Sequence, residues 1–507
     1  MSEEKKLPSR DVDDGVLGDT TEGDSSSETL QESFIVGWDG GDDDPLSPRS
    51  LGKIRKWIIV IVVSASSLCV TAASSIYTST YAQMEAEFGN SRLVSVSGLS
   101  LFVLGIACGP LLFSPLSEFY GRRPIYLVAW TIYTIWIVPQ AVAKNIATIL
   151  VARFLDGFSG STFLAVSGGT VGDLFSKREL RYPMAIFSVS PFLGPCVGPL
   201  IGGFINYHLE WRWTYYILLI WAFALLVAIV VLVPETYHPV LLRNKARRLR
   251  VSTGDDRWKA PMELTNKSIP RTISLSLLRP FQLLIFEPMC LNLCIFSAIL
   301  LGILYLFFGA FHLIFSANYG FNIWQVGLAF SGIGCGLIIG TASASHVDSL
   351  WRLLHGRRVD IDSDKEISKN ETSEPEHRLP SAVFGAIIVP IGLFLFAWTS
   401  YPTIHWIVPI IGSLLFGIGN ILVFIGIFTF LVDAYPEYAA SALAANSFVR
   451  CLFAAIFPLF GTQMYERLGF QWASSLMAFL TLAMMPFPYI FFKYGKSIRS
   501  RSRFAKR

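Results

Sequence analysis

Two residues of opposite charge, Arg153 and Asp156, stand three positions apart in an otherwise apolar stretch of the sequence. On a helix this spacing places them on one face, where they could partly neutralise each other. Charged groups in a membrane helix are costly, and they are functional by default. An acid beside a permanent cation could change its partner and exchange a proton, because its pKa depends on the nearby charge. The chemistry indicated is proton coupling, with a static ion pair that merely orients the helix as the alternative.

The elements that carry these charges are apolar segments long enough to cross a bilayer. The 507-residue chain is 52% hydrophobic and 15% charged, whereas a soluble domain carries about a quarter charged residues. Segments of about 18–25 apolar residues can cross a bilayer as helices. Twelve such segments, numbered spans 1 to 12, occur at 57–79, 93–113, 124–143, 147–170, 182–206, 212–233, 286–312, 323–344, 381–399, 403–432, 437–462 and 470–493. The sequence predicts an all-α membrane protein with twelve transmembrane helices.

The twelve segments fall into two groups of six. A polar linker loop, 234–285, separates a first bundle, 53–233, from a second bundle, 286–493. The second half echoes the first, because SPLSEFYGRR follows span 2 and ASHVDSLWRLLHGRR follows span 8. Two pseudo-symmetric six-helix bundles are a known construction of transporters, with the solute site near the midplane between them.

The distribution of lysine and arginine predicts the orientation. These cations gather in the loops after spans 2, 4 and 6 and in the basic tail 494–507, whereas the opposite loops hold few. Because cytoplasmic loops carry the excess, both termini are expected in the cytosol. Residues 1–52 are acidic and rich in Ser and Gly, which predicts a disordered tail. The formal net charge of +4 reflects this asymmetry, and no nucleic-acid partner is expected.

Several motifs occur in the order, and on the spans, of the major facilitator superfamily, which the chain resembles over about residues 45–495. SPLSEFYGRRP resembles the family's loop signature between spans 2 and 3, RFLDGFSGS its fourth-span signature, and GPCVGPLIGG the fifth-span signature of drug:proton antiporters. WRWTYY, VPETYHPVLL and LVDAYPEYAASALAANSFVRCLFAAIFPLF resemble the fungal twelve-span branch.

The loop after span 2 is expected to act as a cytosolic gate. The residues that the resemblance implies for this gate are Ser117, Glu118, Gly121, Arg122, Arg123 and Asp173. By the same resemblance, Glu118 meets a helix N-terminus of the second half, where an anion is favoured, and Asp173 pairs with Arg122 or Arg123. The alternative is that the arginines only set the orientation.

Span 5 repeats proline and glycine every fourth residue, although both are poor helix formers. The motif consists of Gly194, Pro195, Gly198, Pro199, Gly202 and Gly203. At this spacing the two residue types form stripes on one helix face, and glycines let a neighbouring backbone approach closely. We expect a kinked helix packed tightly between the halves, while its link to antiport rests on the resemblance. A packing surface without a role in transport is the alternative.

The resemblance also implies a solute cavity lined mainly by spans 1, 4, 7 and 10. On span 7 this chain has Gly309 where many fungal relatives carry Glu. Without that carboxylate a buried dication lacks a partner, which favours a neutral hydrophobic solute over a polyamine. The cavity candidates are Tyr305, Phe308, Phe311, His312, Asn446 and Arg450. For Arg450, in the middle of span 11, a role in helix packing competes with solute contact.

These features predict a proton-coupled efflux transporter that exports a hydrophobic drug, toxin or secondary metabolite by alternating access from a fungal plasma membrane. Its partners would be the solute, protons and the lipid bilayer, and a monomer is expected. The alternatives are an importer of a small nutrient, a polyamine transporter, and a non-transporting receptor or sensor. No metal-ligand cluster, nucleophile elbow or phosphate loop is recognisable, so neither an enzyme nor a cofactor nor a metal site is expected.

Overall fold

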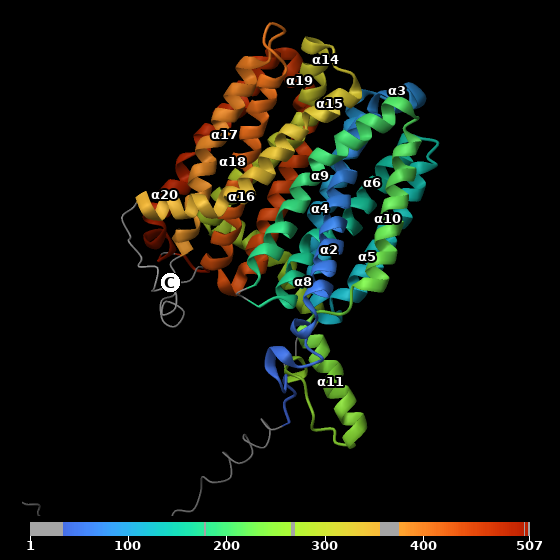
Figure 1. Cartoon of the computed structure of the whole chain (residues 1–507), viewed down its shortest axis with the longest axis vertical. Helices are drawn as coiled ribbons and strands as arrows, with labels where there is room; N and C mark the ends of the chain where they lie inside the picture. The colour runs from blue at the N-terminus through green and yellow to red at the C-terminus, as the bar shows by residue number, and fades with distance from the viewer. Residues whose placement is uncertain (1–33, 177–178, 265–268, 355–374, 501, 505–507) are drawn as a thin grey trace, which may run out of the picture.

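The computed structural model describes residues 34–176, 179–264, 269–354, 375–500 and 502–504, and it is all-helical as predicted (Figure 1). In chain order the α-helices are α2 (Lys53–Ile76), α3 (Tyr81–Phe88), α4 (Arg92–Tyr120), α5 (Arg122–Ala141), α6 (Ile146–Gly160), α7 (Thr162–Ala165), α8 (Ser167–Leu174), α9 (Arg181–His208), α10 (Arg212–Leu232), α11 (His238–Thr253), α12 (Pro261–Leu264), α13 (Ile269–Phe286), α14 (Pro288–Tyr319), α15 (Ile323–Ala329), α16 (Ser331–Leu354), α17 (Pro380–Thr399), α18 (Ile407–Ala434), α19 (Ala439–Met484) and α20 (Pro486–Arg499). The 3-10 turns are η1 (Gly41–Asp43), η2 (Pro48–Ser50), η3 (Tyr77–Thr80), η5 (Pro375–Arg378) and η6 (Pro436–Tyr438).

The helices supply the predicted twelve spans. Ten helical stretches of the described residues are long and apolar enough to cross a membrane. The 20-residue α5 supplies span 3. Gly469, with a φ of 78°, breaks α19 so that this helix contains both span 11 and span 12. Span 4 is made of three pieces, α6 to α8, and span 8 of two, α15 and α16.

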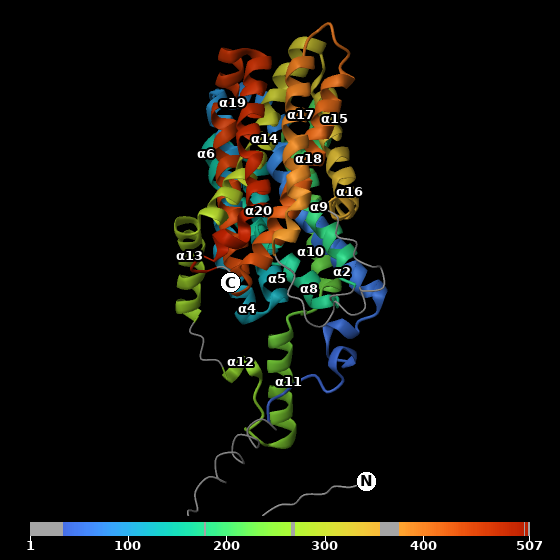
Figure 2. The same cartoon turned by 90° about the vertical axis from the view of Figure 1, so that its left-hand side faces the viewer.

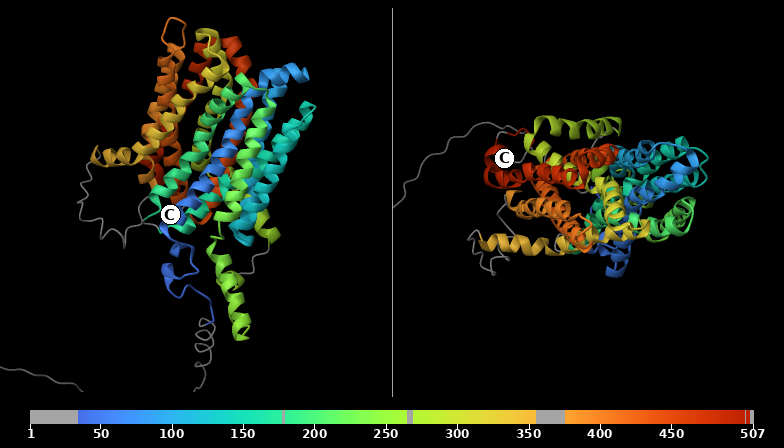
Figure 3. Two further views of the ribbon diagram at one scale, coloured as in Figure 1. Left: turned by 45° about the vertical axis from the view of Figure 1, so that its right-hand side comes forward. Right: turned by 90° about the horizontal axis from the view of Figure 1, so that it is seen from above.

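The two halves repeat one packing plan and lie side by side as two bundles (Figure 1 and Figure 3). In the first half α2 packs on α9, α4 on α6, and α5 on α10. The corresponding spans of the second half pair in the same way, with α14 on α19, α16 on α18, and α17 on the span-12 part of α19. This equivalence is the pseudo-symmetry expected of repeated halves.

The halves meet along two seams that are also related by this symmetry. Span 2 (α4) packs on α19, and span 5 (α9) packs on α15 and α16. Between the seams Phe192 of α9 stacks on Phe424 of α18, with ring centroids 4.7 Å apart. The faces between the halves are therefore in contact through aromatic rings as well as helix backbones.

A small unit extends beyond one end of the bundles, formed by α11 and the first described residues (Figure 2). Ile35 and Lys259 form an isolated parallel bridge, in which the Val36 N–H donates to the Lys259 carbonyl and the Lys259 N–H to the Phe34 carbonyl. Lys245 of α11 donates to Asp39 and to Asp44. The expectation of a disordered tail over 1–52 is thus wrong for 34–52, because apolar residues there pack on the linker; residues 1–33 lie outside the described residues.

Candidate functional site

Arg153 of α6 is fully buried, and each of its three side-chain nitrogens donates a hydrogen bond within the first bundle. Its Nη1 donates to the Ala73 carbonyl at 2.7 Å, its Nη2 to the Ser74 carbonyl at 3.0 Å, and its Nε to the Gly98 carbonyl at 3.4 Å. Ala73 and Ser74 lie in the last turn of α2, whose carbonyls have no α-helical partner and favour a cation. The guanidinium also lies between the rings of Tyr77 and Phe102, whose centroids are 4.4 and 4.3 Å away.

Asp156 faces a different neighbour, although it lies on the same helix. Its Oδ2 accepts a hydrogen bond of 2.9 Å from the Gln140 side chain of α5, and its Oδ1 is buried without a partner. Asp156 is 1% exposed. Arg153 forms no ion pair with it in the described part of the chain, so the two charges are not in direct contact as their spacing suggested. The reason is that the last carbonyls of α2 satisfy Arg153 instead.

Tyr305 links the second half to the Arg153 site. Its hydroxyl lies 2.9 Å from the hydroxyl of Ser74, and the carbonyl of that same serine accepts from Arg153. Ser74 belongs to span 1 and Tyr305 to span 7, so this hydrogen bond crosses between the halves. Any separation of the halves at this level breaks it.

The other cavity candidates of span 7 divide into two groups. Phe308 and His312 line a pocket of about 40 Å³ that both halves enclose. Drug-sized sites measure roughly 300–1,000 Å³, so this pocket as it stands is too small for such a solute. Phe311 is fully buried and packs on Phe330 and Phe396 of the second bundle, so it belongs to the core rather than to the cavity.

Asn446 is likewise an internal residue of the second bundle. Its side-chain amide donates to the hydroxyl of Ser297 on α14 at 3.0 Å, and the residue is fully buried. The sequence analysis named it among the cavity candidates. Its contact instead joins α19 to α14, the pair that corresponds to α9 and α2 in the first half.

Arg450 lies between the halves with its charge unpaired among the described residues. Its guanidinium carbon is 5.5 Å from the ring centroid of Phe192, 5.4 Å from that of Phe424 and 5.2 Å from that of Phe428. Its Nε and Nη1 are buried without a hydrogen-bond partner. The first of these rings belongs to α9 in the first half and the other two to α18 in the second.

The span-5 motif packs on two neighbours. A side chain at Gly194 or Gly198 would collide with Thr71 or Ser75 of α2, and one at Gly202 would lie 2.8 Å from Ile76. The glycine stripe therefore faces span 1 of its own half, which corrects the expectation that it packs between the halves.

The contact between the halves is made by other residues of the motif. A side chain at Gly203 would lie 2.8 Å from the Ile323 carbonyl of α15, and one at Gly327 of α15 would collide with the Pro199 carbonyl. Gly203 therefore belongs to the seam between the halves. A side chain at Gly203 would therefore disturb the contact between the halves rather than the packing of span 5 on span 1.

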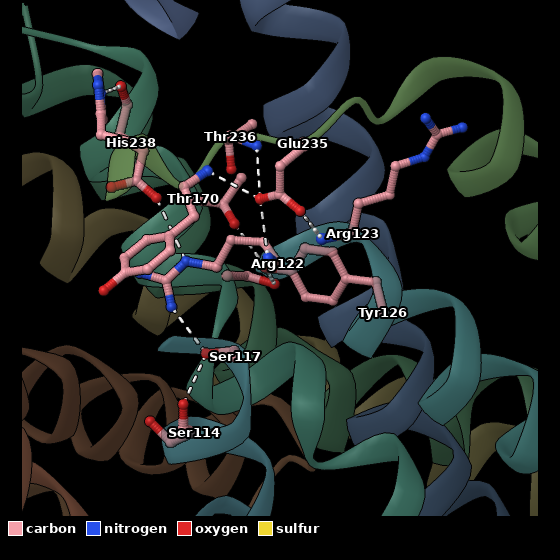
Figure 4. A network of polar contacts seen from close by, with 12 residues as sticks. Ser114, Ser117, Arg122, Arg123, Tyr126, Thr170, Glu235, Thr236 and His238 are labelled. Carbon is pink, nitrogen blue, oxygen red and sulfur yellow. Dashed lines mark hydrogen bonds and ion pairs between the residues drawn. The ribbon is translucent and has the colours of Figure 1, made fainter. Parts of the chain in front are cut away.

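The gate residues at the end of spans 2 and 4 form a connected polar cluster (Figure 4). The Arg122 guanidinium pairs with Asp173 at 3.3 Å and donates to the Ser117 hydroxyl at 3.0 Å. His238 donates from Nε2 to the Asp173 carbonyl at 3.0 Å. The structure thus brings Ser117, Arg122 and Asp173 together, and Arg122 is the arginine that pairs with the aspartate.

Glu235, in the VPETYHPVLL segment, anchors this cluster, and the sequence reasoning did not select it. One carboxylate oxygen accepts from the backbone N–H of Arg122 at 2.9 Å and the other from that of Arg123 at 3.1 Å (Figure 4). It therefore holds the N-terminus of α5, where a negative charge is favoured. Gly121, with a φ of 97°, is required beside it, since any side chain there would collide with the Glu235 carboxylate. The Pro-Glu-Thr sequence after span 6 was the feature of the sequence that could have indicated the role of Glu235.

Glu118 stands apart from this cluster. Its side chain is exposed, and no hydrogen bond or ion pair joins it to another residue that the structure describes. Its contact with a helix N-terminus of the second half stays a prediction. The second Gly-Arg-Arg, at 356–358, and the cations at 177 and 178 lie outside the described residues.

Within the described ranges no group of three or more His, Cys, Asp or Glu residues is arranged to hold a metal ion. What the arrangement can do is move charge and change contacts between two halves. Two symmetric bundles with buried charges and a small pocket between them define a membrane transporter that works by rearranging its halves.

The comparisons with known proteins identify the family. The model of the major facilitator superfamily matches residues 63–458, and the chain belongs to this superfamily. It is 52% identical over 488 residues to "Efflux pump atB" of Aspergillus terreus, covering 96% of this chain and 93% of that protein. It is 41% identical to "Probable drug/proton antiporter YHK8" of Saccharomyces cerevisiae, covering 90% and 87%.

Solved structures agree on the fold. The human organic anion transporter MFSD10 has a TM-score of 0.59 at 17% identity, covering 85% of this chain and 99% of that one. The proton:xylose symporter XylE has a TM-score of 0.60 at 13% identity, covering 88% and 96%. This likeness confirms the predicted fold of twelve helices in two bundles. The chain is a multi-pass membrane protein and not an enzyme.

Proposed function

We propose that this protein exports a small hydrophobic drug, toxin or secondary metabolite in exchange for protons. Its similarity to fungal proteins named as efflux pumps, over nearly the whole chain, is the observation that carries this proposal. The relative named as a probable drug/proton antiporter supports the proton as the coupled ion. The fold supports alternating access, in which the halves rock and expose a central site to each side in turn.

Asp156 is the proposed proton carrier. It is a buried carboxyl group with a single hydrogen-bond donor and one unpartnered oxygen. Burying an ionised carboxylate without a cation is costly, so gain or loss of a proton changes the energy of this site. Arg153 has the role of holding α6 against the end of α2, one helical turn from the acid, rather than that of its counter-ion.

The coupling route runs through span 1. Arg153 binds the backbone of Ser74, and the hydroxyl of Ser74 binds Tyr305 of the second half. A movement of α6 that accompanies proton exchange is therefore transmitted to the contact between the halves. Entry of a solute must separate the rings of Phe192 and Phe424 between the halves. It therefore also acts on the hydrogen bond between Ser74 and Tyr305.

At the cytosolic end, Arg122, Asp173 and Glu235 are proposed to keep α4, α5 and α8 together as one rigid unit while the halves rock. The basic residues beside this cluster favour a cytosolic position for this end. Both termini then lie in the cytosol, because the first described residues and α20 lie toward the same end of the bundles as α11 (Figure 2). We further propose that the protein is a monomer of the fungal plasma membrane.

Vesicles test this proposal directly. In inside-out vesicles that contain the full chain, a labelled hydrophobic aromatic solute should accumulate in the lumen when the lumen is made acidic. This accumulation should stop when the pH gradient is collapsed. Asp156→Asn should remove this dependence. A solute that leaves the lumen along with protons would instead indicate the importer alternative. Spermine should not be carried, since the described cavity residues offer it no carboxylate.

A further inference from the structure

The guanidinium of Arg450 lies between the halves and is only partly hydrogen-bonded among the described residues. Its Nε and Nη1 are buried donors without acceptors, and it has no ion pair there. The three phenylalanine rings around it attract a cation through their faces. Ring faces accept no conventional hydrogen bond. The site therefore offers a positive charge and free N–H groups to whatever enters between the halves.

A second unpartnered group lies on the helix that supplies two of those rings. Asn420 of α18 is fully buried, and both its Nδ2 and its Oδ1 lack a hydrogen-bond partner. It precedes Phe424 by four residues, so both lie on one face of α18. Buried polar atoms are usually satisfied, and each exception needs an explanation. A polar solute group that binds during transport would explain both exceptions.

The rings themselves belong to both halves. Phe192 of α9 stacks on Phe424 of α18 next to the guanidinium. When the halves part, this stack must open and present two ring faces beside a cation. An aromatic solute can replace the lost stacking, and an acidic group on it can pair with Arg450.

We propose that Arg450 binds an anionic oxygen group of the exported solute, so that the physiological substrate is a hydrophobic organic acid rather than a neutral compound. This inference rests on the proposed export function and deepens it. The apolar part of the acid stacks between Phe192 and Phe424, and its carboxylate or a comparable oxyanion accepts hydrogen bonds from Arg450. Asn420 supplies a further donor and acceptor for polar groups of the same solute.

The test compares matched pairs of aromatic carboxylic acids and their primary amides, from one to three rings, with naphthoic acid and naphthamide as the central pair. Binding to the purified full-length protein is measured at a pH where the acids are ionised. We expect at least one acid to bind about tenfold more tightly than its amide. Arg450→Gln should reduce this preference to less than about twofold while leaving the affinity for the amide unchanged.

Two further variants serve as controls. Arg450→Lys keeps the charge and should retain part of the preference. Arg467→Gln removes an exposed cation from the same helix and should retain all of it. If no acid in the panel is preferred over its amide, or if the preference survives Arg450→Gln, the proposal is wrong.

The outcome is separable from the export function. If vesicles carry acids and amides equally well under a pH gradient, and Arg450→Gln changes neither, export stands and this inference falls. If acids bind through Arg450 but no probe is moved by the gradient, the inference stands and proton-coupled export falls. Because weak acids cross lipid in response to a pH gradient, protein-free vesicles and Asp156→Asn vesicles set the background.

Discussion

Arg153 is a fully buried arginine and Arg450 a half-buried one, both in the middle of membrane spans, and their surroundings differ. Arg153 donates to three backbone carbonyls and lies between two aromatic rings, all within the first bundle. Arg450 lies among three aromatic rings from both halves, with two nitrogens lacking any acceptor. The comparison separates two uses of the same side chain. A cation whose hydrogen bonds are satisfied holds a structure together, whereas one whose donors remain free can recognise a ligand.

The comparison predicts the largest effect at Arg153. Arg153→Gln should destabilise the protein by about 3 kcal/mol or more, because it removes a donor from each of three buried carbonyls and each group left unsatisfied costs about 1–3 kcal/mol. Thermal unfolding of the purified protein measures this loss. A melting temperature equal to that of Arg467→Gln would show that Arg153 is not structural.

The packing of span 5 on span 1 provides the next test. Gly198→Leu should cost about 1–3 kcal/mol or more and stall transport, because the backbone of α2 leaves no room for a side chain there. The matched control is Gly309→Leu, where an added Cβ would meet only Thr462, at 3.9 Å. Vesicle transport and melting temperature are compared for both. Equal tolerance of the two substitutions would contradict the packing of span 5 on span 1.

Asp156 lies on the same helix as Arg153 but forms no ion pair with it, so its replacement should affect transport and not stability. Asp156→Asn keeps the hydrogen-bonding shape beside Gln140 and removes the charge, so stability should change by less than about 1 kcal/mol. Transport driven by a pH gradient should fall at least tenfold, while exchange of solute without a gradient continues. A large loss of stability would mean instead that Asp156 is needed as an anion in the fold.

The smallest effect on transport is expected at the hydrogen bond between Ser74 and Tyr305, which links the halves. Ser74→Ala removes the hydroxyl that binds Tyr305 but keeps the carbonyl that binds Arg153, so it should cost about 1 kcal/mol. The turnover rate should change severalfold, because the hydrogen bond between the halves must break in each cycle. Tyr305→Phe should give the same change. Different effects of the two variants would show that this hydrogen bond is not the contact that matters.

Much of the fold followed from the sequence because lipid imposes strong rules. Long apolar segments, loop cations and repeated motifs predicted two six-helix bundles, and the gate pairing of Arg122 with Asp173 came from the resemblance. Helix periodicity could not predict partners, since Arg153 and Asp156 are close in sequence yet contact different helices. Likewise, Phe311 and Asn446 are buried within their own bundle, and the ordered segment 34–52 depends on packing against a distant linker.

The most direct test of the central claim is the melting temperature of ligand-free Arg450→Gln beside that of Arg153→Gln. A charge without a counter-ion in apolar surroundings is unfavourable, so replacing it by a neutral group removes a cost. The account therefore predicts that Arg450→Gln melts at or above the temperature of the unaltered protein, while Arg153→Gln melts well below it. A loss of stability in Arg450→Gln as large as that in Arg153→Gln would contradict the claim that Arg450 is free to bind a solute.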